Sequence, residues 1–130
     1  IEILLKSGYV PVVAPVGFLS YSTEESVRLL NINADTAAGE IAAALGAERL
    51  IFLTDVVGIC DQSGKLLPEL SPDEVESLIA SGVASGGMIP KIKACLRALS
   101  GGAAACIIDG RQPHALLNEM EKGNIGTTIR

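Results

Sequence analysis

The chain has 130 residues, of which 48% are hydrophobic and 14 are glycine, and this composition excludes a disordered protein. Its formal net charge of −5 argues against a nucleic-acid binder, because binding a phosphate backbone needs clustered Lys and Arg. The three cysteines show no CxxC spacing, which favours free thiols in a reducing compartment over a disulfide frame or a zinc site.

The first third of the chain predicts three short elements. Residues 1–7 have the pattern of the last turns of a helix that ends at Gly8, so we expect the chain to begin inside a fold. Residues 9–15 are rich in β-branched side chains and predict a buried strand, although two prolines limit its pairing. Within residues 18–30, Ser22 and Glu25 form a capping-box pair that predicts the start of a short helix.

The middle of the chain alternates helix, strand and hairpin. From Ala34 onward, apolar residues recur at helical spacing through Leu45, and Gly46 is a typical helix C-cap. Residues 49–53 are too apolar for an exposed strand and predict a buried one. The stretch around Ser63-Gly64 predicts a small hairpin.

The last half continues the alternation. Ser71-Pro72-Asp73-Glu74 is a strong helix start, and we expect that helix to end at Gly82. Further elements are predicted as a helix over 88–99, a strand over 103–109, a helix from Pro113 to about Lys122, and an edge strand in the tail 126–130. Strands that alternate with helices predict an α/β fold, a three-layer α/β/α sandwich with a mainly parallel sheet.

Polar residues gather in loops that a parallel sheet brings to the carboxyl ends of its strands. Three such loops are residues 31–35, 54–58 and 109–111. A fourth candidate is the glycine loop 84–88, which runs into a helix start where free N–H groups and the helix dipole attract an anion. Lys91 lies one turn into that helix, so the sequence predicts a phosphate site there.

Each of these residues also has an ordinary structural explanation. Asn33 and Asp35 are typical helix caps, and Asp55 is a typical turn residue after a strand. The glycines form an ordinary connection, and Lys91 and His114 are ordinary surface residues. Taken one at a time, the residues favour these structural explanations.

Taken together, the segments NINADTAAGEIAAALGAERL, IFLTDVVGI, SGGMIPKIKA and IIDGRQPHALL resemble, in this order, the acetylglutamate kinases of the amino acid kinase family. The resemblance covers residues 31–129, with a weaker match in GYVPVVAPVG before them. It implies an amino acid kinase or carbamate kinase-like fold. It also implies phosphorylation of the γ-carboxylate of N-acetyl-L-glutamate by ATP, a step of arginine biosynthesis.

The resemblance implies a role for particular residues. Asp35 matches an aspartate that organises catalytic lysines, and Lys91 matches a lysine that contacts the transferred phosphoryl group. Asn31 and Asn33 match the side chains that hold acetylglutamate. The residues that it implies for nucleotide binding lie in two segments and are Thr54, Asp55, Val56, Gly58, Ile59, Cys60, Val83, Ala84, Ser85, Gly86, Gly87 and Met88.

The ligands implied are ATP and N-acetyl-L-glutamate, with Mg²⁺ carried by the nucleotide and no metal bound by the protein alone. An arginine effector and a homo-oligomer of the full enzyme are also suggested by the resemblance. Neither a nucleic acid nor a membrane is expected as a partner. We expect a cytoplasmic location, or a plastid one if the source is eukaryotic.

The chain also departs from the family pattern. Residues 1–130 are expected to form a single domain that matches the carboxyl-terminal nucleotide-binding half, with the amino-terminal half and its glycine-rich loop and lysine absent. We therefore expect the chain alone to be inactive or weak. Residues 18–30 exceed the hairpin usual before NINAD, so we expect Asn31 to be displaced from its usual position. Two alternatives stay open: a family member with another acceptor, and a non-catalytic nucleotide-binding or subunit-interaction module.

Overall fold

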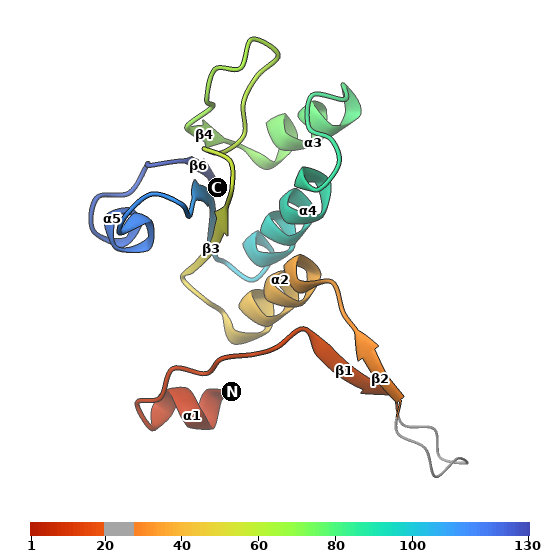
Figure 1. Cartoon of the computed structure of the whole chain (residues 1–130), viewed down its shortest axis with the longest axis vertical. Coiled ribbons are helices and arrows are strands. Elements are labelled where there is room, and N and C mark those ends of the chain that lie inside the picture. The colour runs from red at the N-terminus through yellow and green to blue at the C-terminus, as the bar shows by residue number, and fades with distance from the viewer. Residues whose placement is uncertain (20–27) are drawn as a thin grey trace.

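The computed structural model describes residues 1–19 and 28–130, in which helices cover both faces of a central sheet (Figure 1). This arrangement confirms the three-layer α/β fold class that the sequence predicts. In chain order, the elements are α1 (Glu2–Lys6), β1 (Val16–Leu19), β2 (Arg28–Asn31), α2 (Ala34–Leu45), β3 (Arg49–Thr54), β4 (Glu69–Leu70), α3 (Pro72–Ala80), α4 (Met88–Leu99), β5 (Ala104–Asp109), α5 (Ala115–Lys122) and β6 (Thr127–Ile129).

Four strands form the central sheet in the order β3-β5-β6-β4. Strand β3 is parallel to β5, and β4 is parallel to β6. Strands β5 and β6 are antiparallel, since the chain returns to the sheet through α5 in the opposite direction. The sheet is therefore mixed, although most of its pairings are parallel as predicted.

Strand β5 shows why the sheet needs a helix layer on each face. Ala105 and Ile107 lie in the main core, to which helices α2, α3 and α4 contribute. Cys106 and Ile108 lie in a smaller core with Ala115 of α5 on the opposite face. Because successive side chains of a strand point to opposite faces, a strand covered on both sides is apolar throughout.

Helices α2 and α4 pack at a very short distance because small residues face one another. A Cβ atom added to Gly39 of α2 would lie 2.8 Å from the Ala94 carbonyl oxygen and 2.9 Å from the Ala94 Cα atom of α4. These atoms belong to the backbone, so they move only if a helix moves. The absence of a side chain at Gly39 therefore allows the two helices to approach this closely.

Most local signals in the sequence act as predicted. Asn33 caps α2 by accepting a hydrogen bond from the Thr36 backbone N–H, and Gly46 ends that helix in the left-handed conformation at φ +59°. Ser71 and Glu74 form the predicted capping box at the start of α3. These capping hydrogen bonds satisfy N–H groups that the first turn of a helix would otherwise leave free.

The tail of the chain corrects one prediction. Strand β6 is not an edge strand, because it lies between β5 and β4. Thr127 and Ile129 are 0% exposed, as side chains of an interior strand should be. The three residues of β6 are too short a sequence pattern to distinguish an edge strand from a central one.

Two further corrections concern the first 31 residues. Residues 9–15 form no strand, and pairing starts only at Val16, where β1 runs antiparallel to β2. Pro11 and Pro15 supply no N–H for a sheet, which explains this limit. The helix predicted from Ser22 lies largely outside the described residues, and its expected end at 28–30 belongs to strand β2.

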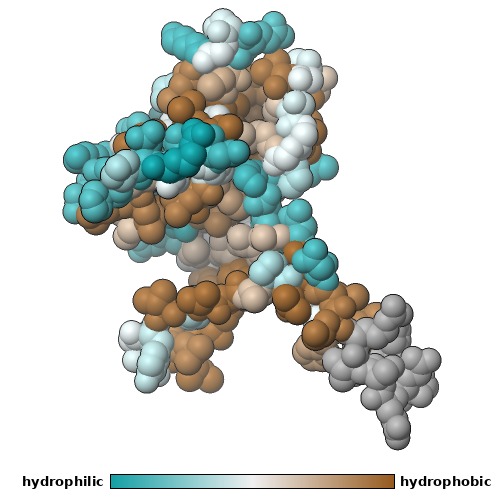
Figure 2. Space-filling view, in the orientation of Figure 1, coloured by the Kyte–Doolittle hydropathy of each residue, from teal (hydrophilic) through white to brown (hydrophobic). Residues whose placement is uncertain are grey.

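The surface of residues 1–19 and 28–31 is strongly apolar (Figure 2). Val10 and Val12 are 88% and 96% exposed, and Phe18 of β1 is 70% exposed. Across the described ranges, each helix is too short or too polar to cross a membrane.

Candidate functional site

A cleft of about 710 Å³ lies between the loop that follows β3 and the loop that precedes α4. This volume is typical of sites for small ligands, which are roughly 300–1,000 Å³. The residues that line it are Thr54, Asp55, Val56, Val57, Gly58, Ile59, Cys60, Asp61, Val83, Ala84, Ser85, Gly87, Met88 and Lys91.

The cleft has an apolar floor and a rim of both polar and apolar residues, since Val56 and Val57 are 39% and 48% exposed. Ile59 and Ala84 are buried at its base, only 2% and 5% exposed. Asp55 and Ser85 are exposed at its sides. An apolar floor with a few polar groups at the rim suits a flat organic ring that carries polar substituents.

Lys91 places one positive charge at the cleft. Its Nζ atom donates to both carboxylate oxygens of Asp35, at 2.9 and 3.1 Å. The same Nζ atom lies 5.9 Å from the centroid of the Phe52 ring. The Lys91 and Asp35 side chains are partly buried, at 27% and 20% exposed, so water screens this ion pair less than a surface pair. The ammonium group is thereby held in one position.

The two helix starts bring this pair together. Asp35 lies in the first turn of α2 and Lys91 in the first turn of α4. One turn further along α2, Gly39 allows the backbone contact with α4. The short distance between these helices is therefore what lets an aspartate and a lysine 56 positions apart form two hydrogen bonds.

The glycine loop before α4 offers fewer free N–H groups than its sequence predicts. Met88 N–H donates to the Ser85 carbonyl oxygen at 3.1 Å, and Ile89 N–H donates to that of Gly86 at 3.2 Å. Pro90 has no N–H group. The attraction of this helix start for an anion therefore comes chiefly from the Lys91 ammonium and the helix dipole.

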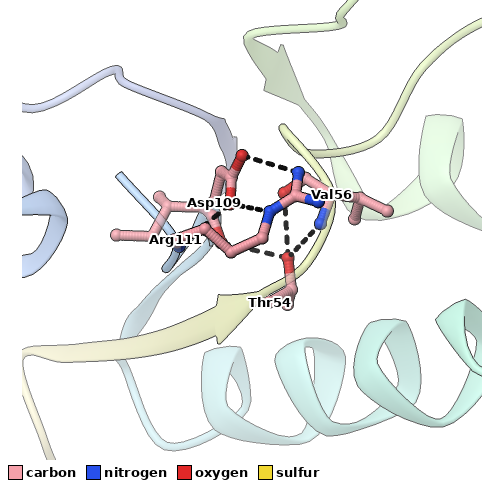
Figure 3. A network of polar contacts seen from close by, with 5 residues as sticks. Thr54, Val56, Asp109 and Arg111 are labelled. Atoms are coloured by element: carbon pink, nitrogen blue, oxygen red, sulfur yellow. Dashed lines mark hydrogen bonds and ion pairs between the residues drawn. The ribbon is translucent and has the colours of Figure 1, made fainter. Parts of the chain in front are cut away.

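The carboxyl ends of β3 and β5 are tied together by a polar network (Figure 3). Thr54 Oγ1 donates to the Ile108 carbonyl oxygen at 3.0 Å, and Gly110 N–H donates to the Thr54 carbonyl oxygen at 2.8 Å. Arg111 donates from Nε and Nη2 to the two carboxylate oxygens of Asp109, each at 2.9 Å. Its guanidinium holds the pKa of the Asp109 carboxyl well below the usual range. These bonds hold the end of β3 in place, and with it the first residue of the loop that follows.

The structure brings together most of the residues that the sequence singles out. Every residue predicted to bind the nucleotide, except Gly86, lines the cleft, and so does Lys91. Val57 also lines the cleft and lies within the predicted loop 54–58, whereas sequence reasoning missed Asp61, which adjoins a predicted residue. The Asp61 carboxylate is occupied by the Ser63 hydroxyl and nearby N–H groups of its own turn, which lower its pKa.

The two asparagines lie elsewhere. Asn31 ends β2 and is exposed, and Asn33 uses its side-chain oxygen to cap α2. Neither residue lines the cleft. Of the loop 31–35, Asp35 alone reaches it, through Lys91. A role of Asn31 and Asn33 in holding an acceptor therefore stays a prediction.

Comparison with known proteins identifies the family. Residues 1–109 match the model of the amino acid kinase family. The chain belongs to this family. It is 53% identical over 130 residues to an acetylglutamate kinase of Dehalococcoides mccartyi, which confirms the resemblance found in the sequence. The match covers 99% of this chain and 48% of that kinase, so the chain spans about half the length of this relative.

Solved structures of the same fold agree with this assignment. An N-acetylglutamate synthase from Neisseria gonorrhoeae superposes with a TM-score of 0.85 and 31% identity, over 98% of this chain and 29% of the synthase. That synthase was solved with coenzyme A and N-acetyl-glutamate, and also with coenzyme A and L-arginine. A Giardia lamblia carbamate kinase bound to AMP-PNP has a TM-score of 0.68 over 86% of this chain and 36% of its own. Its 24% identity supports the shared fold alone.

Proposed function

We propose that this chain is the nucleotide-binding half of an acetylglutamate kinase, which transfers a phosphoryl group from ATP to the γ-carboxylate of N-acetyl-L-glutamate in arginine biosynthesis. The observation that carries the proposal is the Asp35–Lys91 pair beside an apolar cleft of about 710 Å³. The 53% identity to an acetylglutamate kinase supports the choice of reaction.

The cleft suits a nucleotide. Its apolar floor, with Ile59 and Ala84, offers contact to the flat base. Asp55 and Ser85 at the rim offer acceptors for ribose hydroxyl groups. Lys91, which also lines the cleft and is held by Asp35, would then face the phosphates.

For phosphoryl transfer, the protein must position the two substrates and place positive charge near the transferred group. A carboxylate acceptor is already an anion and gives up no proton, so the reaction does not need Asp35 as a general base. It instead fixes the Lys91 ammonium by two charge-assisted hydrogen bonds. That ammonium stabilises the negative charge on the migrating phosphoryl group.

Mg²⁺ fits this site as an ion carried by the nucleotide. The described ranges contain no group of three or more His, Cys, Asp or Glu side chains placed to hold a metal. Mg²⁺ commonly relies on substrate phosphates and water for most of its ligands. The chemistry that it supplies when bound is neutralisation of phosphate charge.

The remaining parts of the proposal rest on the relatives. Asn31 and Asn33 would contribute to the acetylglutamate site of a full-length enzyme. An arginine effector is supported by the L-arginine complex of the related synthase. A homo-oligomer of the full enzyme and a cytoplasmic location complete the proposal.

The direct test is phosphoryl transfer by this chain fused to the amino-terminal half of the Dehalococcoides mccartyi kinase. ADP formation should depend on N-acetyl-L-glutamate. Lys91→Ala should lower kcat by about 100-fold or more, as the loss of one preorganised donor does. Lys93→Ala is the matched control, because Lys93 is exposed two positions further on, and it should leave kcat close to the parent value.

Other outcomes would point to the alternatives. Turnover with a different amino acid would indicate another acceptor in the same family. Mg-ATP binding without turnover in the fused protein would favour a non-catalytic binding module. A Lys91→Ala variant as active as the parent would contradict the proposed site.

A further inference from the structure

The loop on the β3 side of the cleft, residues 55–58, is held at each end by a threonine hydroxyl. At its start, Thr54 Oγ1 accepts a hydrogen bond from Val56 N–H at 3.2 Å. At its end, Thr127 Oγ1 accepts from Ile59 N–H at 2.8 Å. Thr54 lines the cleft itself, but Thr127 belongs to β6 and does not.

The Thr127 hydroxyl bridges two chain segments. It accepts from Ile59 N–H and donates to the Leu67 carbonyl oxygen at 2.7 Å. Ile59 and Leu67 lie on the two sides of the hairpin that follows the cleft, joined by the Leu67 N–H to Ile59 carbonyl bond at 2.9 Å. One buried hydroxyl therefore ties both sides of this hairpin to the central sheet.

Two glycines allow the chain around Thr127 to pack closely against its neighbours. A Cβ atom on Gly58 would lie 2.6 Å from Thr127 Oγ1, and Gly58 has φ +143°, which side-chain-bearing residues rarely adopt. A Cβ atom on Gly126 would collide with the Ile107 carbonyl oxygen. The loop, the hydroxyl and the centre of the sheet are thus in direct contact.

We propose that Thr127 is a positioning residue for the nucleotide, which sets the path of residues 55–58 through its bond to Ile59. This inference rests on the proposed function, since it assumes that the cleft holds ATP. Removing the hydroxyl would leave a buried N–H and a partly buried C=O without their partner, so the loop would spend time in other conformations. The apparent affinity for nucleotide falls with the fraction of loops in the competent conformation.

The experiment compares three variants of this chain by calorimetric titration with Mg-ATP. Thr127→Val keeps the side-chain shape but loses the hydroxyl, and it should raise the Kd about tenfold. Thr127→Ser keeps the hydroxyl and should restore the Kd to within about twofold. Thr128→Val is the matched control on the same strand, because the Thr128 hydroxyl contacts Cys106 Sγ at 3.7 Å and not the loop.

Amide hydrogen exchange provides a readout that needs no nucleotide. In Thr127→Val, peptides covering residues 58–67 should exchange faster, while those of α4 keep their rate. If the valine variant folds poorly, Thr127→Cys supplies an intermediate case, since a thiol is only a weak donor and acceptor. Its Kd should fall between those of the serine and valine variants.

The outcomes separate this inference from the proposed function. If the parent chain binds no Mg-ATP, the proposed function fails and the inference fails with it. If the parent binds but Thr127→Val binds equally well, the inference alone is overturned. Equal losses in Thr127→Val and Thr128→Val would also overturn it, because they would indicate general destabilisation.

Discussion

Two regions of this chain are rich in aliphatic residues but bury them very differently. In residues 33–130, here the packed region, Ile92 and Ile107 are 0% exposed between a sheet and its helices. In residues 1–19 and 28–32, here the open region, Val12 is 96% exposed. Aliphatic composition alone therefore does not make a core. The packed region has two helix layers against one sheet, and the cleft lies only there, where the backbone is held from several sides.

The largest effect should come from truncating a core side chain. Ile107→Ala should lower the free energy of unfolding by roughly 2–5 kcal/mol, because it leaves a cavity at a site with 0% exposure. Val12→Ala, in the open region, should change it by less than about 0.5 kcal/mol. Urea unfolding followed by circular dichroism measures both. Similar losses would show that the open region is packed in solution.

Adding a methyl group should also destabilise the packed region more than the open region. Gly39→Ala should destabilise the chain by about 1–3 kcal/mol, because its Cβ atom meets the Ala94 backbone. Gly17→Ala should cost less than about 0.5 kcal/mol, because its Cβ atom meets only the mobile end of Ile32, at 2.6 Å. The same unfolding curves test this, and a harmless Gly39→Ala would contradict the close packing of α2 and α4.

Acid should weaken the packed region through Asp109. Arg111 lowers the pKa of Asp109 in the folded chain, so the pair stabilises the fold at pH values above the unfolded pKa of about 4. That stability is lost as the pH falls from about 4 through the folded pKa. Arg111→Gln should therefore lower the urea midpoint at pH 7, by an amount that shrinks below pH 4.

A pair in the open region is the control for this pH dependence. Lys6 and Glu2 are 79% and 67% exposed with an N–O distance of 3.4 Å, so water screens their attraction. At each pH from 7 down to 3, Lys6→Gln should have the same urea midpoint as the parent. If the Arg111→Gln curve ran parallel to that of the parent over this range, Asp109 would not be the group responsible.

The smallest effect concerns the thiols, all of which are free. Burial raises the pKa of Cys95 to about 12 and also raises the pKa of Cys106. At pH 8, iodoacetamide should therefore modify mainly Cys60, which lines the cleft and is half-buried. Mass spectrometry should show that Mg-ATP slows this reaction several-fold, whereas in urea all three thiols react. Rapid modification of Cys95 in the folded chain would contradict its burial.

The sequence predicted best where signals were local and chemically explicit. The capping residues Asn33 and Ser71 and the C-cap Gly46 each act through hydrogen bonds or backbone angles of their own segment. The Asp35–Lys91 contact joins residues 56 positions apart, and only the family resemblance implied that Asp35 organises a lysine. The family motifs added what no local rule contains, the expectation that two distant segments form one cleft.

Other features depend on pairings that a short pattern does not specify. The sequence of the tail predicted a strand but not its central place, which follows from pairing with β5 on one side and β4 on the other. For the same reason Thr127 was not a candidate, because its contact with Ile59 joins residues 68 positions apart. Residues 9–15 had the composition of a buried strand, but composition does not supply a neighbouring strand.

The most direct test of the account is thermal unfolding of this chain with and without Mg-ATP. A ligand that binds only the folded state at a hundredfold excess over its Kd adds about 2.7 kcal/mol of stability, which should raise the Tm by several degrees. We predict that this shift shrinks in Lys91→Ala and persists in Lys93→Ala. No shift at millimolar Mg-ATP, in a chain shown to be folded, would contradict the assignment of the cleft to ATP.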